Sequence, residues 1–91
     1  MLRITIVDRA DRIVMKLEGK LKGAFAKELE RVWSELRSQN GHKALCVDLT
    51  SVSFVDYRGK GVLSGMRREN VELFAAGPLM TSVVEEIAQH Q

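Results

Sequence analysis

Apolar and polar residues alternate along the first part of the chain. Every second position is apolar in two segments, first at Leu2, Ile4 and Ile6 and then at Ile13, Met15 and Leu17. This alternation predicts two half-buried β-strands. The polar segment 8–11 between them reads as a turn, so we expect an antiparallel hairpin. Segment 19–23 is expected to connect the hairpin to the next element.

The period changes between residues 24 and 38, where apolar residues recur every three or four positions. They are Phe25, Leu29, Val32, Trp33 and Leu36. This spacing predicts an amphipathic helix with one buried face, in which Trp33 packs in the core. Gly23 is an acceptable N-cap, and Asn40-Gly41 is a plausible helix stop.

The segment Lys43–Leu49 is a nearly unbroken apolar run. Such a run is typical of a strand that is buried on both faces of a sheet. We expect the chain to turn after this strand and to return to the end of the sheet through the short apolar pair Phe54-Val55. A helix is then expected from about Arg58 to Arg68, with Val62, Leu63 and Met66 inward.

The last part of the chain predicts a short strand and a final helix. The strand is expected over Val71–Ala75, after a turn that leaves only Asn70 between it and Glu69. Gly77-Pro78 opens the helix, because proline suits the first helical position. Its expected apolar face is Leu79, Val83, Val84, Ile87 and Ala88.

The order of elements is therefore strand, strand, helix, strand, helix, strand, helix. A hairpin followed by alternating helices and strands predicts an α/β fold with a mixed sheet. We expect residues 1–91 to form one small domain, because single domains typically reach ~100–150 residues. The strand Lys43–Leu49 should be central, and about three helices should cover at least one face.

Composition narrows the class of protein. The chain is 45% hydrophobic and 29% charged, as in a globular domain. It has no apolar run near the ~20 residues that span a bilayer. The apolar start is too short for a signal peptide, so we expect a cytoplasmic protein without membrane insertion. A net charge of +2 without interleaved aromatic residues argues against nucleic-acid binding.

Few residues could carry chemistry. Asp48 and Asp56 could form an acid–base pair or hold a magnesium ion. No nucleophile accompanies them, and the histidines lie elsewhere, His42 in the turn before the apolar strand and His90 near the end. We therefore expect no catalytic residue, metal or cofactor, and loop-capping hydrogen bonds from both aspartates. Cys46, the only cysteine, is expected to be a buried hydrophobe.

Three glycines lie close together, at Gly59, Gly61 and Gly65. They superficially match a dinucleotide-binding fingerprint, but one residue too many precedes the third glycine, and no acidic residue ends the next strand. We expect instead that Gly61 and Gly65 thin one face of the helix, so that it lies close to the sheet.

Segment 47–63 resembles the signature of the STAS domains, the family of the anti-sigma factor antagonists and of the cytoplasmic tails of sulfate transporters. In that family a strand ending in Asp-Leu, here Asp48-Leu49, is followed by an apolar stretch, a loop Asp-Ser-Ser/Thr-Gly and an aliphatic helix. The loop here is Asp56-Tyr57-Arg58-Gly59. The resemblance covers nearly the whole chain and implies the same order of elements, although relatives tend to have a longer helix after this loop.

The resemblance implies a non-catalytic regulatory module of bacterial transcription that binds an anti-sigma factor or serine-kinase-type regulator. An accessory subunit of a membrane transporter is the alternative. The family's second hydroxyl residue is phosphorylated, but Arg58 stands at that position and accepts no phosphate. The expected partner contacts are Ser53, Asp56, Tyr57, Arg58, Lys60 and Arg67. Arg58 could be either an exposed docking residue or a structural partner of Asp56 or Asp48.

Overall fold

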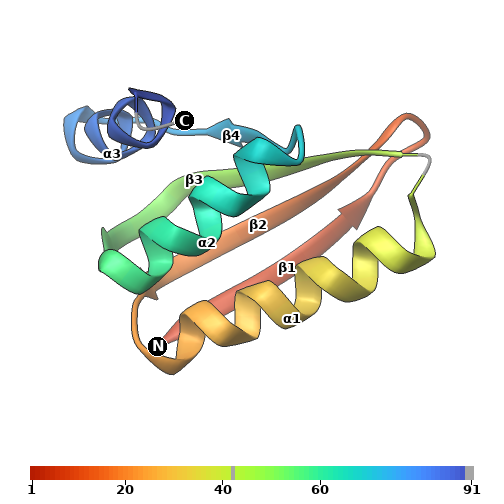
Figure 1. Ribbon diagram of the computed structural model, residues 1–91, viewed down its shortest axis with the longest axis horizontal. Helices are drawn as coiled ribbons and strands as arrows, with labels where there is room; N and C mark the ends of the chain where they lie inside the picture. The colour runs from red at the N-terminus through yellow and green to blue at the C-terminus, as the bar shows by residue number, and fades with distance from the viewer. Residues whose placement is uncertain (42, 90–91) are drawn as a thin grey trace.

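The computed structural model describes residues 1–41 and 43–89; the sequence predictions for His42 and His90 lie outside these ranges. Within them, strands and helices follow one another in the predicted order (Figure 1). The strands are β1 (Leu2–Asp8), β2 (Arg12–Leu21), β3 (Ala44–Val55) and β4 (Glu72–Phe74). The helices are α1 (Ala24–Gln39), α2 (Tyr57–Arg68) and α3 (Pro78–Gln89).

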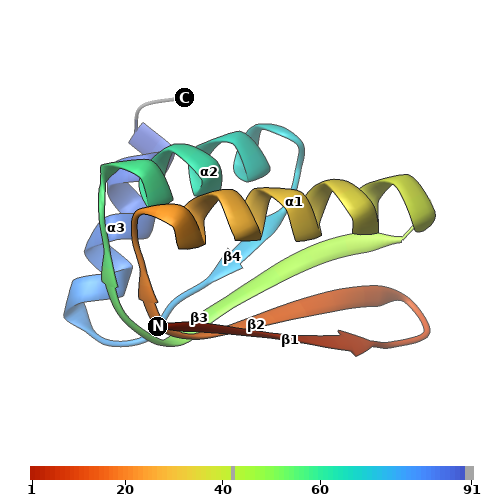
Figure 2. The same ribbon diagram turned by 90° about the horizontal axis from the view of Figure 1, so that it is seen from below.

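The strands form one mixed sheet in the order β1-β2-β3-β4. β1 pairs with β2 antiparallel, whereas β2 with β3 and β3 with β4 are parallel. The hairpin, the mixed sheet and the central place of the Lys43–Leu49 segment, now part of β3, are therefore confirmed. Figure 2 shows α1 and α2 side by side over one face of the sheet, and α3 packs next to α2.

The three helices and the covered face of the sheet share one core. α1 contributes Ala26, Leu29 and Trp33, and α2 contributes Leu63 and Met66. The face of α3 differs from the prediction, because Met80 is buried with Val83 and Ile87 while Leu79 is 58% exposed. Met80, Val83 and Ile87 are spaced by three and four residues, so they lie on one face of the helix. Leu79, one residue before Met80, points away from that face.

The second face of the sheet is open, which corrects the prediction that β3 is buried on both faces. All three helices bury their residues in the same core, and no helix of residues 1–41 and 43–89 crosses the opposite face. On that face Cys46 is buried, as expected, but Asp48 is only half-buried and Thr50 is exposed. On the open face the segment Lys43–Leu49 carries the small side chains of Ala44 and Cys46. They made the segment look apolar throughout, but they do not require a helix to cover them.

β2 and β3 both extend further than the sequence predicted. β2 continues to Leu21, and β3 continues through the predicted break to Val55. Their pairing shifts register twice, between Lys16 and Glu18 and between Gly19 and Lys20, where β3 carries an extra residue. A β-bulge inserts one extra residue into a strand and bends it locally without ending the pairing. The sequence signals of a turn therefore mark irregular positions within one long strand.

Two local devices support these irregularities. At the first bulge the Asp48 carboxylate accepts hydrogen bonds from the Thr50 backbone N–H (2.9 Å) and hydroxyl (2.6 Å). These bonds, chiefly the one from the hydroxyl, hold the pKa of Asp48 below its usual range. Near the second bulge Gly19 adopts a φ of 106°, a region that favours glycine.

The tight turn after α2 is explained by its cap. Asn70 adopts a left-handed φ of 66°. Its N–H donates to the Arg67 carbonyl, and the N–H of Val71 donates to the Met66 carbonyl, both at 3.0 Å. This is the Schellman pattern, in which asparagine can replace glycine.

In the described part of the chain, no helix combines the length and apolar character needed to cross a bilayer.

Candidate functional site

The starts of α1 and α2 lie next to each other because of the sheet topology. β2 and β3 are parallel, and their last residues, Leu21 and Val55, are paired. The residues that follow each strand therefore meet at one end of the sheet. Figure 1 shows both helices beginning at this end, away from the tip of the β1–β2 hairpin.

Asp56 connects the two helix starts. It is the N-cap of α2, and its Oδ1 accepts a hydrogen bond from the Gly59 N–H at 2.9 Å. Its Oδ2 accepts one from the N–H of Gly23, the N-cap of α1, also at 2.9 Å. The bond from Gly59, followed by that from Gly23, lowers the pKa of Asp56. The predicted loop-capping role is confirmed for Asp56, both of whose oxygens are engaged, whereas Asp48 bonds Thr50 within β3 and caps no loop.

Gly59 allows α2 to approach the end of β2. A Cβ at this buried position would lie 2.7 Å from the Leu21 carbonyl oxygen and 2.9 Å from a methyl carbon of Val55. The prediction for Gly61 and Gly65 was wrong, since no atom lies within 4 Å of a Cβ at either position. The close approach is made one helical turn or less from the cap, where Asp56 fixes the helix to the sheet.

Tyr57 and Arg58, the first residues of α2, are exposed, Tyr57 to 75%. The Arg58 guanidinium lies over the Tyr57 ring, 5.6 Å from its centroid, and Nε donates to the phenol oxygen at 3.1 Å. Within residues 1–41 and 43–89, no carboxylate forms an ion pair with Arg58. Because its side chain is exposed, Arg58 is not a buried partner of Asp56 or Asp48, although its backbone and its charge make a smaller contribution to the lowered pKa of Asp56.

The other predicted contacts are spread around this pair. Lys60 forms an ion pair with Glu86 of α3, at 3.2 Å between Nζ and Oε2. Ser53 is exposed and donates from its hydroxyl to the Gly19 carbonyl at 3.3 Å. Arg67 is exposed near the other end of α2, roughly 13 Å further along the helix axis than Arg58. The structure thus brings together Asp56, Tyr57 and Arg58, and it separates them from Arg67.

An open groove between α1 and α2 adjoins this site, with a volume of about 600 Å³. It is lined by Gly23, Ala24, Ala26, Lys27, Glu30, Arg58, Gly61 and Val62. This groove was not predicted from the sequence, although small residues in the two facing helices are a signal that could have indicated it. In the described ranges, no group of histidine, cysteine and acidic side chains is arranged to hold a metal ion.

Comparison with known proteins rests on structure, since no family model matches the chain. An anti-sigma factor antagonist from Mycobacterium paratuberculosis superposes with a TM-score of 0.85 at 18% identity, covering 98% of this chain and 80% of that one. The anti-sigma factor antagonist SpoIIAA, in its unphosphorylated form, gives a TM-score of 0.71 at 22% identity, covering 93% of this chain and 82% of that one.

A part of a larger protein, Mglu, is also similar. Its TM-score is 0.64 at 22% identity, and the match covers 81% of this chain but only 19% of Mglu. Likeness at this level of identity concerns the fold. The order of strands and the three helices give this chain the fold of the two anti-sigma factor antagonists.

Proposed function

We propose that the chain is a non-catalytic protein-interaction module that acts like an anti-sigma factor antagonist, in the cytoplasm, without the phosphorylation switch of that family. The observation that carries the proposal is the exposed Tyr57–Arg58 pair at the start of α2. The fold likeness to two anti-sigma factor antagonists supports the class of function.

The pair has the properties of an interface anchor. Tyrosine and arginine are enriched among the residues that dominate binding energy at protein interfaces. Here the two side chains stack on each other, so part of their conformational entropy is already lost before binding. The double cap by Asp56 holds the backbone below them, and such pre-organisation favours affinity.

The side chain at position 58 decides how the module is regulated. It lies at the second residue of α2, where free N–H groups and the helix dipole favour a phosphate. A phosphorylated hydroxyl there would change the local charge by about −1.5 to −2. Arginine has no hydroxyl and keeps a positive charge, so the surface stays in one state under a serine kinase.

The engagement of the aspartates supports a non-catalytic role. Both oxygens of Asp56 accept backbone N–H groups, and the carboxylate of Asp48 is bonded by Thr50 at the bulge in β3. The carboxylate of Asp56 thus serves the backbone, and Oδ1 of Asp48 serves Thr50. A nucleotidase or phosphoesterase activity that disappears in Asp56→Asn would contradict the non-catalytic role.

Affinity capture from extracts of the native host tests the proposed interaction. The double variant Tyr57→Ala/Arg58→Ala should lose a partner that the parent retains. The matched control Arg9→Ala/Arg12→Ala changes two exposed arginines at the tip of the β1–β2 hairpin, at the other end of the sheet, and should retain it. Retention by Tyr57→Ala/Arg58→Ala would refute the role of this pair. The variant Arg67→Ala shows whether the interface extends along α2.

The identity of the captured protein separates the two functions. An anti-sigma factor or serine-kinase-type regulator supports the proposal, whereas a transporter component supports the accessory-subunit alternative. Incubation with the captured kinase and ATP should leave segment 53–60 unmodified by mass spectrometry. Phosphate on Ser53 or Tyr57 would mean that the switch has moved along the loop.

A further inference from the structure

The groove between α1 and α2 has an excess of positive charge at its rim. Lys27 of α1 and Arg58 of α2 face it from its two walls, and Glu30 is the acidic side chain among its lining residues. In the part of the chain that the structure describes, neither Lys27 nor Arg58 forms an ion pair with a carboxylate. Lys27 can therefore meet an incoming group directly, and Arg58 can do so through the nitrogens that Tyr57 does not engage.

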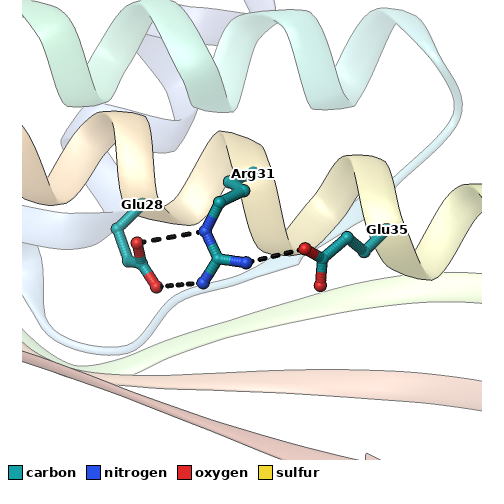
Figure 3. Close-up of polar contacts among 3 residues, drawn as sticks. All are labelled: Glu28, Arg31 and Glu35. Carbon is teal, nitrogen blue, oxygen red and sulfur yellow. Dashed lines mark hydrogen bonds and ion pairs between the residues drawn. The ribbon is translucent and has the colours of Figure 1, made fainter.

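The nearby acidic residues are engaged elsewhere. Figure 3 shows Arg31 between Glu28 and Glu35, with N···O distances of 2.5 Å to Glu28 and 2.7 Å to Glu35. Arg31 also lowers the pKa of Glu28 through their hydrogen bond. Both carboxylates are bonded to Arg31, and neither forms an ion pair with Lys27.

Asp56 offsets the charge of the rim only in part, although it lies close enough to Arg58 for that charge to help lower its pKa. Its carboxylate accepts hydrogen bonds from the starts of both helices, through Gly23 and Gly59. Each helix N-terminus is equivalent to about half a positive charge, so the two ends together offset one carboxylate. The charged residues that line the groove are therefore two cations, Lys27 and Arg58, and one carboxylate, Glu30.

The floor of the groove is small and open. Gly23, Ala24 and Ala26 line it from α1, and Gly61 lines it from α2. No atom lies within 4 Å of a Cβ built on Gly61, so there is room above this residue for a side chain from outside. The groove therefore combines space between two helices with one basic residue on each wall.

We propose that this groove receives a partner segment that carries aspartate or glutamate side chains. The inference rests on the proposed function, and it adds the chemistry of the partner. A carboxylate between the walls can pair with Lys27 and form the two parallel hydrogen bonds that arginine offers. Charge complementarity of this kind sets orientation and association rate at protein interfaces.

An NMR titration with hexaglutamate tests the chemistry without the natural partner. The amide signals of Ala24, Lys27, Arg58 and Gly61 should shift in a saturable way at low salt. The shifts should shrink at about 0.5 M salt, because screening weakens exposed ion pairs. Hexalysine should give none of these shifts. Absence of saturation with hexaglutamate, or equal shifts at the β1–β2 turn, would overturn the proposal.

Charge and shape variants localise the effect. Lys27→Glu/Arg58→Glu should weaken hexaglutamate binding by about tenfold or more. The control Arg9→Glu/Arg12→Glu has the same net charge and should bind as the parent does. Gly61→Leu should also weaken binding by about tenfold while the helix stays folded, since leucine has the higher helix propensity. An equal loss in the charge control would show attraction to net charge alone.

The same variants separate failure of this inference from failure of the proposed function. If a captured partner depends on Tyr57 and Arg58 but binds Lys27→Glu and Gly61→Leu normally, the interaction module stands and the groove proposal falls. If the captured partner is lost in Lys27→Glu and in Gly61→Leu and is released by salt, the groove proposal is supported.

Discussion

A methyl group added at Gly59 tests the close contact between α2 and the end of β2. In Gly59→Ala the new Cβ would lie 2.7 Å from the Leu21 carbonyl oxygen. That oxygen belongs to the main chain and accepts the Asp56 N–H at 3.1 Å, so it cannot turn away without weakening this bond. The other neighbours, Leu21 Cγ and Val55 Cγ1, lie at 2.9 Å in the buried core.

Two opposing effects set the magnitude. Alanine gains about 1 kcal/mol over glycine in helix propensity. Overpacking a well-filled site costs about 1–3 kcal/mol, and the rigid main-chain neighbour places Gly59 in the upper part of that range. We therefore expect Gly59→Ala to lower the free energy of unfolding by about 1–2 kcal/mol. Gly61→Ala and Gly65→Ala meet no atom and should each gain up to about 1 kcal/mol.

Urea unfolding followed by tryptophan fluorescence measures these differences. Trp33, the only tryptophan, is 7% exposed in the folded state, so unfolding changes its surroundings. A thermal scan should agree, with about 4–8 °C in Tm per kcal/mol for a domain of this size. The reasoning is refuted if Gly59→Ala is as stable as the parent, or if it gains stability together with Gly61→Ala.

Further predictions concern the loop and the core. The stability that the Asp56 carboxylate provides should be complete above about pH 5, and it should be lost as the pH falls below about 3.9 toward the lowered pKa of the folded state. The free energy of unfolding of Asp56→Asn, measured between about pH 3 and 6, should lack this loss at low pH. Arg58→Ser should change the free energy of unfolding by less than about 1 kcal/mol, because the arginine side chain is exposed and its replacement removes a mild dipole penalty. A larger loss of stability in urea unfolding would show that Arg58 has a structural role. Cys46 is 2% exposed and should react with a thiol reagent only under unfolding conditions; rapid labelling of the native protein would contradict its burial.

The order of elements could be predicted from the sequence because each helix and strand carries its own period. The helix boundaries at Ala24 and Pro78 followed from local signals, Gly23 as a cap and proline at the first helical position. The continuation of β3 through Thr50–Val55 could not be predicted in this way. It depends on bulges that exist only once β2 is paired beside it.

The candidate site was predictable in part. The loop at Asp56–Gly59 and its cap follow from the residues themselves, and Arg58 was marked by its departure from the family pattern. The hydrogen bond from the Gly23 N–H to Asp56 could not be derived from local sequence, because it requires that β2 and β3 be neighbours and parallel. The role of Gly59 likewise depends on tertiary contact, since Gly61 and Gly65 look equivalent to it in the sequence.

The shared carboxylate of Asp56 has a consequence for how the domain opens. First turns of helices usually fray independently, yet here the N–H groups of Gly23 and Gly59 depend on one acceptor, Asp56, which lies 33 residues from Gly23 and 3 from Gly59. Opening at one helix start therefore loosens the other, and both should belong to a single unit in hydrogen exchange. A partner that bends the start of α2 would also move the start of α1, so the two walls of the groove would respond to binding together.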